Sequence, residues 1–241
     1  MEHKLKGIIL NTFRFKETSL ICHIYTTDFG RKAYIFNGVR KERSKGKSAM
    51  LQPLFMLDMD VLQNNKAEIQ RVKEFRLEYA YQSIPFHPVK SSLAFFISEV
   101  LYKLLREEQP NPQLFEFLHS ALIALDVMDE GIYNFHLYLL VQLTKYLGLR
   151  PSMLEMGTPA FFDLKSGEVT PIEPKHPTYM SRRLTACFEQ LYYVGIGNLA
   201  EVKMSRAERR ELIDKMVEFF GIHFGSTIEL KSLAVVHELF D

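Results

Sequence analysis

Hydrophobic and polar residues alternate over most of the first 80 residues, and this two-residue period is typical of β-strands. Leu57, Met59 and Val61, for example, alternate with two aspartates, which predicts one buried and one hydrated strand face. Five such strands in so short a stretch favour a small closed barrel of the OB-fold type, because closure leaves no unpaired edge. The predicted strands cover residues 4–15, 20–27, 31–39, 51–63 and 68–79.

After residue 80 the apolar positions recur every three or four residues, as they do on one face of a helix. Residues 134–147 are apolar on nearly all sides, which predicts a central, buried helix. Ser205 and Glu208 form a capping-box pattern that predicts the start of a later helix. Three of the predicted helices cover residues 91–107, 134–147 and 231–239. A further helix begins at Pro112 and extends at least to Leu125, another begins after Ser181, and another runs from Ser205 to Gly221.

Residues 151–180 interrupt the helices with five prolines and two glycines. Within them, Phe161–Leu164 and Glu168–Thr170 flank a Lys-Ser-Gly turn and predict a small hairpin. We therefore predict an α+β, multi-domain protein. In it, an OB-fold barrel over residues 1–80 precedes an all-α domain over residues 81–241 that carries this irregular hairpin insert.

The chain has 30 Lys and Arg against 29 Asp and Glu, but the two signs are unevenly distributed. Residues 1–80 hold 15 basic and 9 acidic residues, whereas residues 81–241 hold 15 basic and 20 acidic residues. The overall balance excludes a uniformly basic coat protein, but it leaves room for a basic binding face on the barrel. The hydrophobic share of 47% also excludes an intrinsically disordered chain.

Two cysteines, Cys22 and Cys187, cannot form a disulfide framework, so we expect a reducing compartment, the cytoplasm. The longest stretch without a charged side chain, Gly131–Thr144, has 14 residues. A membrane span needs roughly 20 apolar residues. We therefore expect a protein that does not enter a membrane.

No recognised catalytic motif is present. The Gly-Lys-Ser tripeptide at 46–48 resembles part of a phosphate-binding loop, but Lys41 stands where that loop needs its first glycine. Asp58 and Asp60 share a strand face that could hold a divalent metal ion, although a hydrated face is the simpler explanation because no third ligand is nearby. We therefore predict no catalytic residues, no metal site and a protein that is not an enzyme.

The segment that follows the third predicted strand is the strongest local signal in the chain. It carries five cations and one anion over residues 40–48, and its glycine and two serines predict a mobile loop. Cations on a barrel can neutralise phosphates while nearby aromatic rings stack on bases, so we favour nucleic-acid binding. The alternative is a hydrated basic loop without a ligand, beside aromatic residues that only fill the barrel core. The cations, with two from the preceding strand, are Arg31, Lys32, Arg40, Lys41, Arg43, Lys45 and Lys47, and the aromatic residues are Phe13, Tyr25, Tyr34 and Phe36.

Seven short segments form a pattern, in their order and spacing, that spans most of the chain. They are Lys6–Leu10, Glu17–Ile21, Tyr25–Arg31, Asn37–Lys41, Leu51–Leu54, Pro110–Phe115 and Lys145–Pro151. Taken together, these segments resemble the RecO family of DNA repair and recombination mediator proteins. The resemblance implies an N-terminal OB-fold and a C-terminal helical domain, which agrees with the division drawn from the hydrophobic pattern.

The resemblance implies a non-enzymatic, DNA-binding protein that works in the cytoplasm at the nucleoid. RecO-like proteins bind single- and double-stranded DNA and promote strand annealing. Together with RecR, they help to load recombinase onto DNA that single-strand-binding protein has coated. With the basic segment, the resemblance suggests phosphate contacts at Arg14, Arg31, Lys32, Arg40, Lys41, Arg43, Lys45 and Lys47.

The family also implies that the helical domain binds the acidic C-terminal tail of single-strand-binding protein. Such a tail would need an apolar slot beside a cation, and the sequence does not choose among four arginines on predicted helices. The alternative is that such arginines pair with carboxylates one helical turn away, as Arg210 would with Asp214. The four candidates are Arg182, Arg183, Arg206 and Arg210.

The chain departs from the family in one respect. Many members carry a four-cysteine zinc site in the segment that corresponds to residues 151–180, whereas this segment contains no cysteine. We therefore expect no zinc and no other cofactor, and a hairpin held by Phe161, Phe162 and prolines. Two other functions stay open on the sequence alone: a protein-interaction adaptor whose DNA contact is incidental, and an RNA-binding OB protein.

Overall fold

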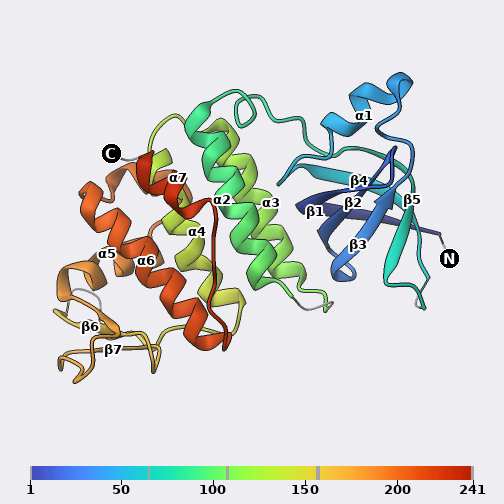
Figure 1. The fold of residues 1–241 in the computed structure, drawn as a ribbon. Coiled ribbons are helices and arrows are strands. Elements are labelled where there is room, and N and C mark those ends of the chain that lie inside the picture. The colour runs from blue at the N-terminus through green and yellow to red at the C-terminus, as the bar shows by residue number, and fades with distance from the viewer. Residues whose placement is uncertain (1, 65, 107–108, 156–157, 240–241) are drawn as a thin grey trace. The chain divides into compact units, whose positions relative to one another are not determined.

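The computed structural model describes residues 2–64, 66–106, 109–155 and 158–239 (Figure 1). Contacts between Cα atoms divide the chain into two compact units, residues 1–126 and 127–241. The first unit therefore holds the strands of the N-terminal segment and the helices α2 (Pro88–Leu104) and α3 (Pro112–Val127) that follow them. The predicted boundary at residue 80 marks the change from strands to helices, and as a domain boundary it stays a prediction.

The first unit contains the closed five-stranded barrel that the alternation predicts. Neighbouring strands pair in the order β1-β2-β3-β5-β4, and β4 closes the barrel against β1. All pairs are antiparallel except β3 with β5, which is parallel. This arrangement confirms an OB-like barrel. The strands are β1 (Glu2–Phe15), β2 (Ser19–Thr26), β3 (Gly30–Phe36), β4 (Met56–Leu62) and β5 (Ile69–Leu77).

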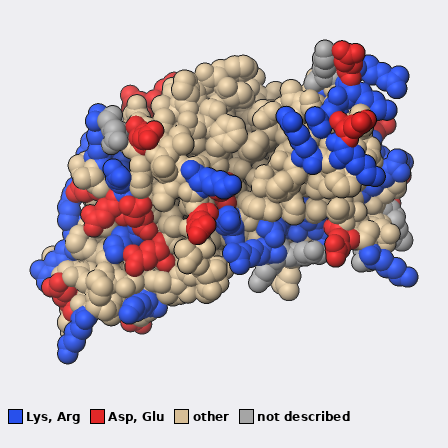
Figure 2. Space-filling view, in the orientation of Figure 1, with Lys and Arg blue, Asp and Glu red and all other residues tan. Residues whose placement is uncertain are grey.

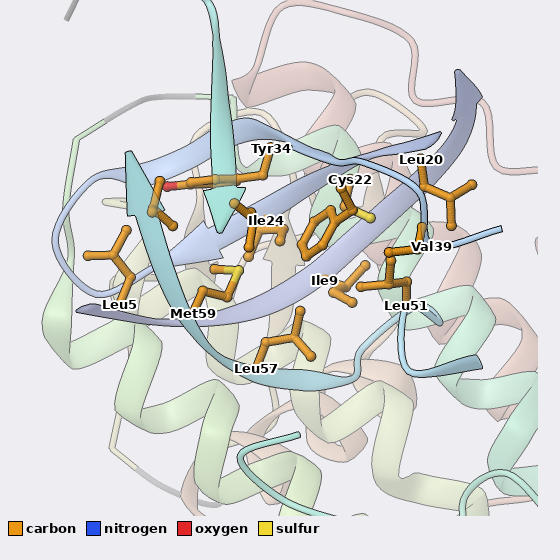
Figure 3. Packing of buried hydrophobic residues seen from close by; sticks show 13 residues of the cluster. Leu5, Ile9, Leu20, Cys22, Ile24, Tyr34, Val39, Leu51, Leu57 and Met59 are labelled. Atoms are coloured by element: carbon orange, nitrogen blue, oxygen red, sulfur yellow. The ribbon is translucent and has the colours of Figure 1, made fainter. Parts of the chain in front are cut away.

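The barrel interior is filled by side chains from alternate strand positions (Figure 3). Ile9, Cys22, Tyr34 and Met59 come from four different strands, and all of them are buried. Gly7 lines the same interior, where a Cβ atom would collide with a side chain of β2, so the close approach of β1 and β2 requires glycine here. The buried core thus explains the period-2 pattern of the N-terminal segment.

The fourth strand and the basic segment before it differ from the prediction. β4 begins at Met56 rather than at residue 51, because the preceding residues anchor the chain to β1: the Leu54 N–H donates to the Ile9 carbonyl oxygen at 2.6 Å. The predicted loop is instead helical over most of its length. It contains a 3-10 turn, η1 (Glu42–Ser44), and a short helix, α1 (Lys45–Ala49).

α2 and α3 are bonded directly to the barrel. On α2, the Ser98 hydroxyl donates to the Leu10 carbonyl oxygen at 2.6 Å. At the start of α3, the Asn111 carbonyl oxygen accepts a hydrogen bond from the Tyr25 hydroxyl at 3.4 Å. α2 begins three residues earlier than predicted, since the His87 side chain caps it and proline occupies its first position.

α4 (Ile132–Tyr146) is the central helix of the second unit, as its apolar pattern predicts: Phe135 and Leu139 are completely buried. Its buried Asn134 amide satisfies two neighbouring backbone carbonyls, because it donates to the Leu199 and Val202 carbonyl oxygens at 2.9 Å each. The other helices of this unit are α5 (Arg182–Tyr193), the 3-10 helix η2 (Ile196–Glu201), α6 (Arg206–His223) and α7 (Leu233–Glu238).

The hairpin predicted in the Pro-rich segment is present, and a third strand joins it in the order β7-β6-β8. Phe162 is completely buried, with its ring stacked 4.8 Å from the ring of Phe188 and tilted 5.3 Å from that of Phe219. Phe162 therefore packs the small sheet against α5 and α6. The strands are β6 (Phe161–Asp163), β7 (Glu168–Thr170) and β8 (Tyr179–Met180).

Candidate nucleic-acid interface

The basic segment, residues 40–47, is anchored to the barrel at both ends. At its start, the Arg40 N–H donates to the Thr18 carbonyl oxygen at 3.0 Å, and the Arg40 guanidinium reaches the Lys16 carbonyl oxygen at 3.5 Å. Just beyond its end, the Thr12 hydroxyl donates to the Leu51 carbonyl oxygen at 3.0 Å. Both anchors lie on β1 or on the turn that follows it. The segment therefore presents its cations from a defined backbone.

Most of the predicted phosphate-binding cations of this region are exposed. Arg14 stands near the end of β1, and Arg40, Lys41, Arg43 and Lys47 lie on the basic segment. Within the described residues, Lys41, Arg43 and Lys47 form no ion pair, so protein carboxylates do not neutralise their charge. Figure 2 shows Lys and Arg side chains gathered where α1 lies in the first unit. The backbone of Lys45 is in α1, and its side chain lies outside the described part.

Arg31 and Lys32 belong to a different part of the barrel surface. Arg31 begins β3, where its guanidinium donates to the Tyr102 carbonyl oxygen at 2.8 Å and lies 5.1 Å from the centre of the Tyr102 ring. Lys32 lies 5.4 Å from the centre of the Phe29 ring. From Arg31 to Phe36 the strand advances by five residues, roughly 17 Å. The predicted cations thus form two groups, one at each end of β3, and Arg31 also holds α2 to the barrel.

Three of the four aromatic residues considered for base stacking are core residues. Tyr25 is 2% exposed, Tyr34 0% and Phe36 1%, so none of them can stack on a base. Phe13 is 42% exposed and faces outward. The prediction of aromatic contacts therefore survives for Phe13 alone.

Two further rings join Phe13 on the outer barrel surface. The His23 ring lies 5.5 Å from Phe13, and the Tyr102 ring lies 5.3 Å from His23, both at edge-to-face angles. Burial, and secondarily the Arg31 cation, lowers the pKa of His23 and so favours its uncharged ring. We call Phe13, His23 and Tyr102 the aromatic patch. The alternation along β2 could have placed His23 on the outer face of the barrel. Tyr102 comes from α2, and the sequence does not reveal where this helix packs on the barrel.

The strand surface beside the aromatic patch is apolar. Phe13 pairs in register with Ile21, and Ile21 with Ile35, so the three side chains share the outer face of β1, β2 and β3. On β5, Ile69 is 40% exposed, and the exposed Arg71 stands opposite Ile35. An apolar sheet face with aromatic rings and cations at its margins can stack on bases and hold phosphates.

The four arginines considered for a protein partner have different environments. The Arg183 guanidinium donates to the Glu208 carboxylate and, at 3.3 Å, to the Lys203 carbonyl oxygen. Arg182 lies 4.9 Å from the centre of the Phe161 ring. The remaining two, Arg206 and Arg210, are exposed on the first turns of α6.

Two pairings around α6 were not predicted. Arg183 and the capping-box hydrogen bond from Ser205 lower the pKa of Glu208 to about 2. Arg210 forms no ion pair in the part of the chain that the structure describes, so its predicted pair with Asp214 is wrong, and the Asp214 carboxylate lies 3.2 Å from His237 instead. All four arginines are exposed, and within the described residues Arg206 and Arg210 have no ion-pair partner.

The side chains considered for covalent or metal chemistry, the two cysteines and Asp58, are either buried or hydrogen-bonded. Both cysteines are buried, and burial raises the pKa of the Cys22 thiol to about 12. The Asp58 carboxylate accepts two hydrogen bonds from the Arg76 guanidinium, at 3.0 and 2.9 Å. Across the described ranges, no three His, Cys, Asp or Glu side chains gather as a metal-ligand group. None of the described helices is both long and apolar enough to span a bilayer.

Family models and curated relatives cover this chain almost completely. The model described as Recombination protein O N terminal matches residues 1–81, and that described as Recombination protein O C terminal matches residues 86–234. Proteins named DNA repair protein RecO from Phocaeicola vulgatus and Flavobacterium johnsoniae are each 32% identical to it, over 240 and 241 residues. One from Bacteroides fragilis is 31% identical over 242 residues. In all three comparisons, 100% of both chains is covered.

Proposed function

The chain belongs to the RecO family of DNA repair proteins, and from this premise we propose that it is a non-enzymatic recombination mediator that binds DNA through its barrel. One observation supports the binding site most directly. Exposed cations that have no ion-pair partner in the described chain, Lys41, Arg43 and Lys47, project from an anchored segment beside an apolar outer sheet face.

The two surfaces have different tasks in this proposal. The basic segment holds phosphates, which are common to single and double strands, and therefore accounts for affinity toward both. The aromatic patch accepts the faces of unpaired bases, which only a single strand offers. A protein that holds two single strands in this way, without reading their sequence, can promote their annealing. No cofactor is needed, and we expect the protein to work without zinc.

In this proposal, the second unit binds the protein partners. The capped N-termini of α5 and α6 carry Arg182, Arg206 and Arg210, and a helix N-terminus favours a nearby anion. These features suit the acidic C-terminal tail of single-strand-binding protein. Binding of that tail and of RecR would direct recombinase loading to coated single strands at the nucleoid.

The basic segment is tested with the triple variant Lys41→Ala, Arg43→Ala, Lys47→Ala. Loss of three phosphate contacts should weaken binding of every DNA sequence and reduce the slope of log affinity against log salt by about 2 for single strands. Titration of fluorescent single- and double-stranded DNA at several salt concentrations measures both quantities. The matched control removes three exposed lysines of the second unit, Lys165, Lys175 and Lys203, and should leave both unchanged.

An unchanged slope in the basic-segment variant would remove residues 40–47 from the interface. Preference for RNA over DNA of the same sequence would instead favour an RNA-binding protein. Partner capture that resists nuclease, together with no binding of DNA at moderate salt, would favour a protein-interaction adaptor.

A further inference from the structure

β3 and β5 separate at one end of their short pairing and leave a hollow between them. The two strands pair in parallel over three residues, and this pairing ends at Ile35 opposite Arg71. Beyond it lies a hollow of about 320 Å³, which Ser44 and Lys47 of the basic segment also line. We call it the β3-β5 hollow. Its volume is at the small end of ligand sites, so it suits one compact group.

The buried residues that line the β3-β5 hollow belong to the barrel core. Phe36, Val39 and Val72 line it, and each is at most 7% exposed. The ring of Phe75, which also lines it, lies edge to face 4.9 Å from the ring of Phe36. Because close packing holds core side chains in place, the hollow is formed before any ligand arrives, which reduces the ordering cost of binding.

Two neutral hydrogen-bond donors line the hollow. The Oδ1 atom of Asn37 accepts a hydrogen bond from the Ser19 hydroxyl at 3.1 Å, so the side-chain N–H groups of Asn37 remain available to a ligand. The Ser44 hydroxyl has no hydrogen-bond partner among the described residues. A group with several acceptor oxygens, such as a phosphate, can accept hydrogen bonds from both.

Two lysine ammonium groups bring positive charge to the same hollow. Lys47 lines it and forms no ion pair within the described residues. The Lys41 ammonium group lies 4.0 Å from the position that a Cβ atom of Gly38 would occupy, and Gly38 lines the hollow. Lys73 also lines it, but the Lys73 ammonium group lies 2.9 Å from the Glu2 carboxylate. Cations beside neutral donors favour an anionic ligand.

The surroundings of the hollow favour a phosphate of a nucleotide chain over a free anion. Arg43 is exposed, stands one residue before Ser44 and does not line the hollow. A phosphate in the hollow therefore has a further cation nearby for the next phosphate of the same strand, whereas a free anion would leave this cation unused. Every nucleotide of a strand carries such a phosphate.

We propose that the β3-β5 hollow binds one backbone phosphate of DNA, with Asn37 and Ser44 as hydrogen-bond donors and Lys41 and Lys47 as the cations. The proposal rests on the DNA-binding function proposed above and deepens it. One phosphate is held at a defined position, and this contact fixes where the strand lies on the barrel without reading its sequence.

A carboxylate placed in the hollow tests the site. Ser44→Asp should weaken binding of DNA on the order of tenfold at moderate salt, because the new charge repels a phosphate and the hydroxyl donor is lost. Aspartate is favourable at the position before a helix, so α1 should persist. Anisotropy of fluorescent DNA measures the affinity, and the thermal unfolding midpoint shows whether the variant is folded.

Ser48→Asp is the matched control. It adds the same charge four residues later in the same short helix, outside the hollow, and should weaken binding at most about threefold. The difference between the two variants separates a phosphate held in the hollow from a general reduction of positive charge.

Glu74 provides a test in the opposite direction. It lines the hollow, is exposed and forms no ion pair in the described part of the chain. Glu74→Gln removes a charge that repels a phosphate there, so it should tighten DNA binding about 2- to 5-fold at low salt. Glu68→Gln makes the same change at an exposed residue outside the hollow and should leave the affinity nearly unchanged. A gain of affinity cannot come from a folding defect.

The outcomes separate this proposal from the proposed function. Suppose that the unmodified protein binds DNA, but Ser44→Asp and Ser48→Asp weaken binding equally and Glu74→Gln does not tighten it. The hollow then holds no phosphate, and the proposed function stands. If the unmodified protein binds no DNA, both proposals fail.

Two further results would overturn the hollow as a DNA site while leaving it a binding site. The first is that thymidine monophosphate binds as tightly as DNA and Ser44→Asp abolishes this binding, which would make the ligand a free nucleotide. The second is that Ser44→Asp abolishes binding of an aspartate-rich peptide and leaves DNA binding unchanged, which would assign the hollow to a protein partner.

Discussion

Glu78 connects three elements of the first unit through its carboxylate. Its oxygens lie 2.9 Å from Lys6 Nζ on β1 and 3.0 Å from His119 Nε2 on α3, while Glu78 itself follows β5. Burial alone would raise the pKa of this carboxyl, but the hydrogen bonds from Lys6 and His119 outweigh burial and hold the pKa below its usual value. The folded state therefore binds this proton less readily than the unfolded chain does.

A lowered pKa has a definite consequence for stability. The carboxylate stabilises the fold at pH values above the ordinary pKa of a glutamate, and this contribution is lost as the pH falls through the lower pKa of the folded state. Glu78→Gln should therefore lower the free energy of unfolding at pH 7 by on the order of 1–2 kcal/mol, and by much less near pH 3. Denaturant unfolding at the two pH values measures the difference, with the exposed Glu68→Gln as the control. An equal loss at both pH values would show that the charge of Glu78 is not what stabilises the unit.

Individual residues of the proposed DNA interface could be predicted from the sequence only where strand alternation decides whether a side chain is buried or exposed. The strand pattern predicts Phe13 but cannot tell it from Tyr25, because α3 covers the outer side of Tyr25 and leaves Phe13 exposed. Tyr102 shares no sequence signal with Phe13, and only the packing of α2 on β1 brings it to the patch. The division between core and surface aromatics thus depends on helix positions that alternation does not contain.

At the scale of elements, long amphipathic segments are predicted well and short ones are not. The strands of the barrel and α4 follow directly from their apolar periods. α1 has five residues and includes Gly46, so neither its period nor its helix propensity can reveal it. β8 has two residues, and only its pairing with β6 identifies it. Tertiary contacts define such elements, and the basic segment is one of them.

The small sheet β6-β7-β8 gives a prediction about metal. Its stability is expected to come from Phe162, which packs between Phe188 and Phe219, and from the turn at Asp163, whose carboxylate accepts the Lys165 N–H at 2.8 Å. A strong chelator should therefore leave the thermal unfolding midpoint unchanged, and elemental analysis of the purified protein should detect no stoichiometric zinc. Phe162→Ala should instead cost about 3–5 kcal/mol of stability.

The exposed Ile172→Ala in the same insert is the control for Phe162→Ala and should change the stability little. A chelator that lowers the unfolding midpoint, or zinc that copurifies in a one-to-one ratio, would show that the insert holds a metal despite its lack of cysteine.

At the scale of the whole molecule, total charge is a poor guide to binding, and its local distribution is a better one. The excess of basic residues over residues 1–80 decreases once α2 and α3 are counted with the barrel: residues 1–126 hold 18 basic and 14 acidic residues, and residues 127–241 hold 12 and 15. The proposed interface therefore depends on a few cations that no carboxylate of the described chain neutralises. It does not depend on the net positive charge of the first unit as a whole.

The DNA footprint should be confined to the first unit, where these cations lie. Acetylation of exposed lysines, followed by mass spectrometry, should slow markedly at Lys41 and Lys47 when single-stranded DNA is bound, because a phosphate in contact with an ammonium group shields it. The rates at Lys165 and Lys175, which are also exposed and lie in the second unit, should not change. Protection in both units would mean that the second unit also contacts DNA, and its cations would then compete with the acidic tail that we propose for them.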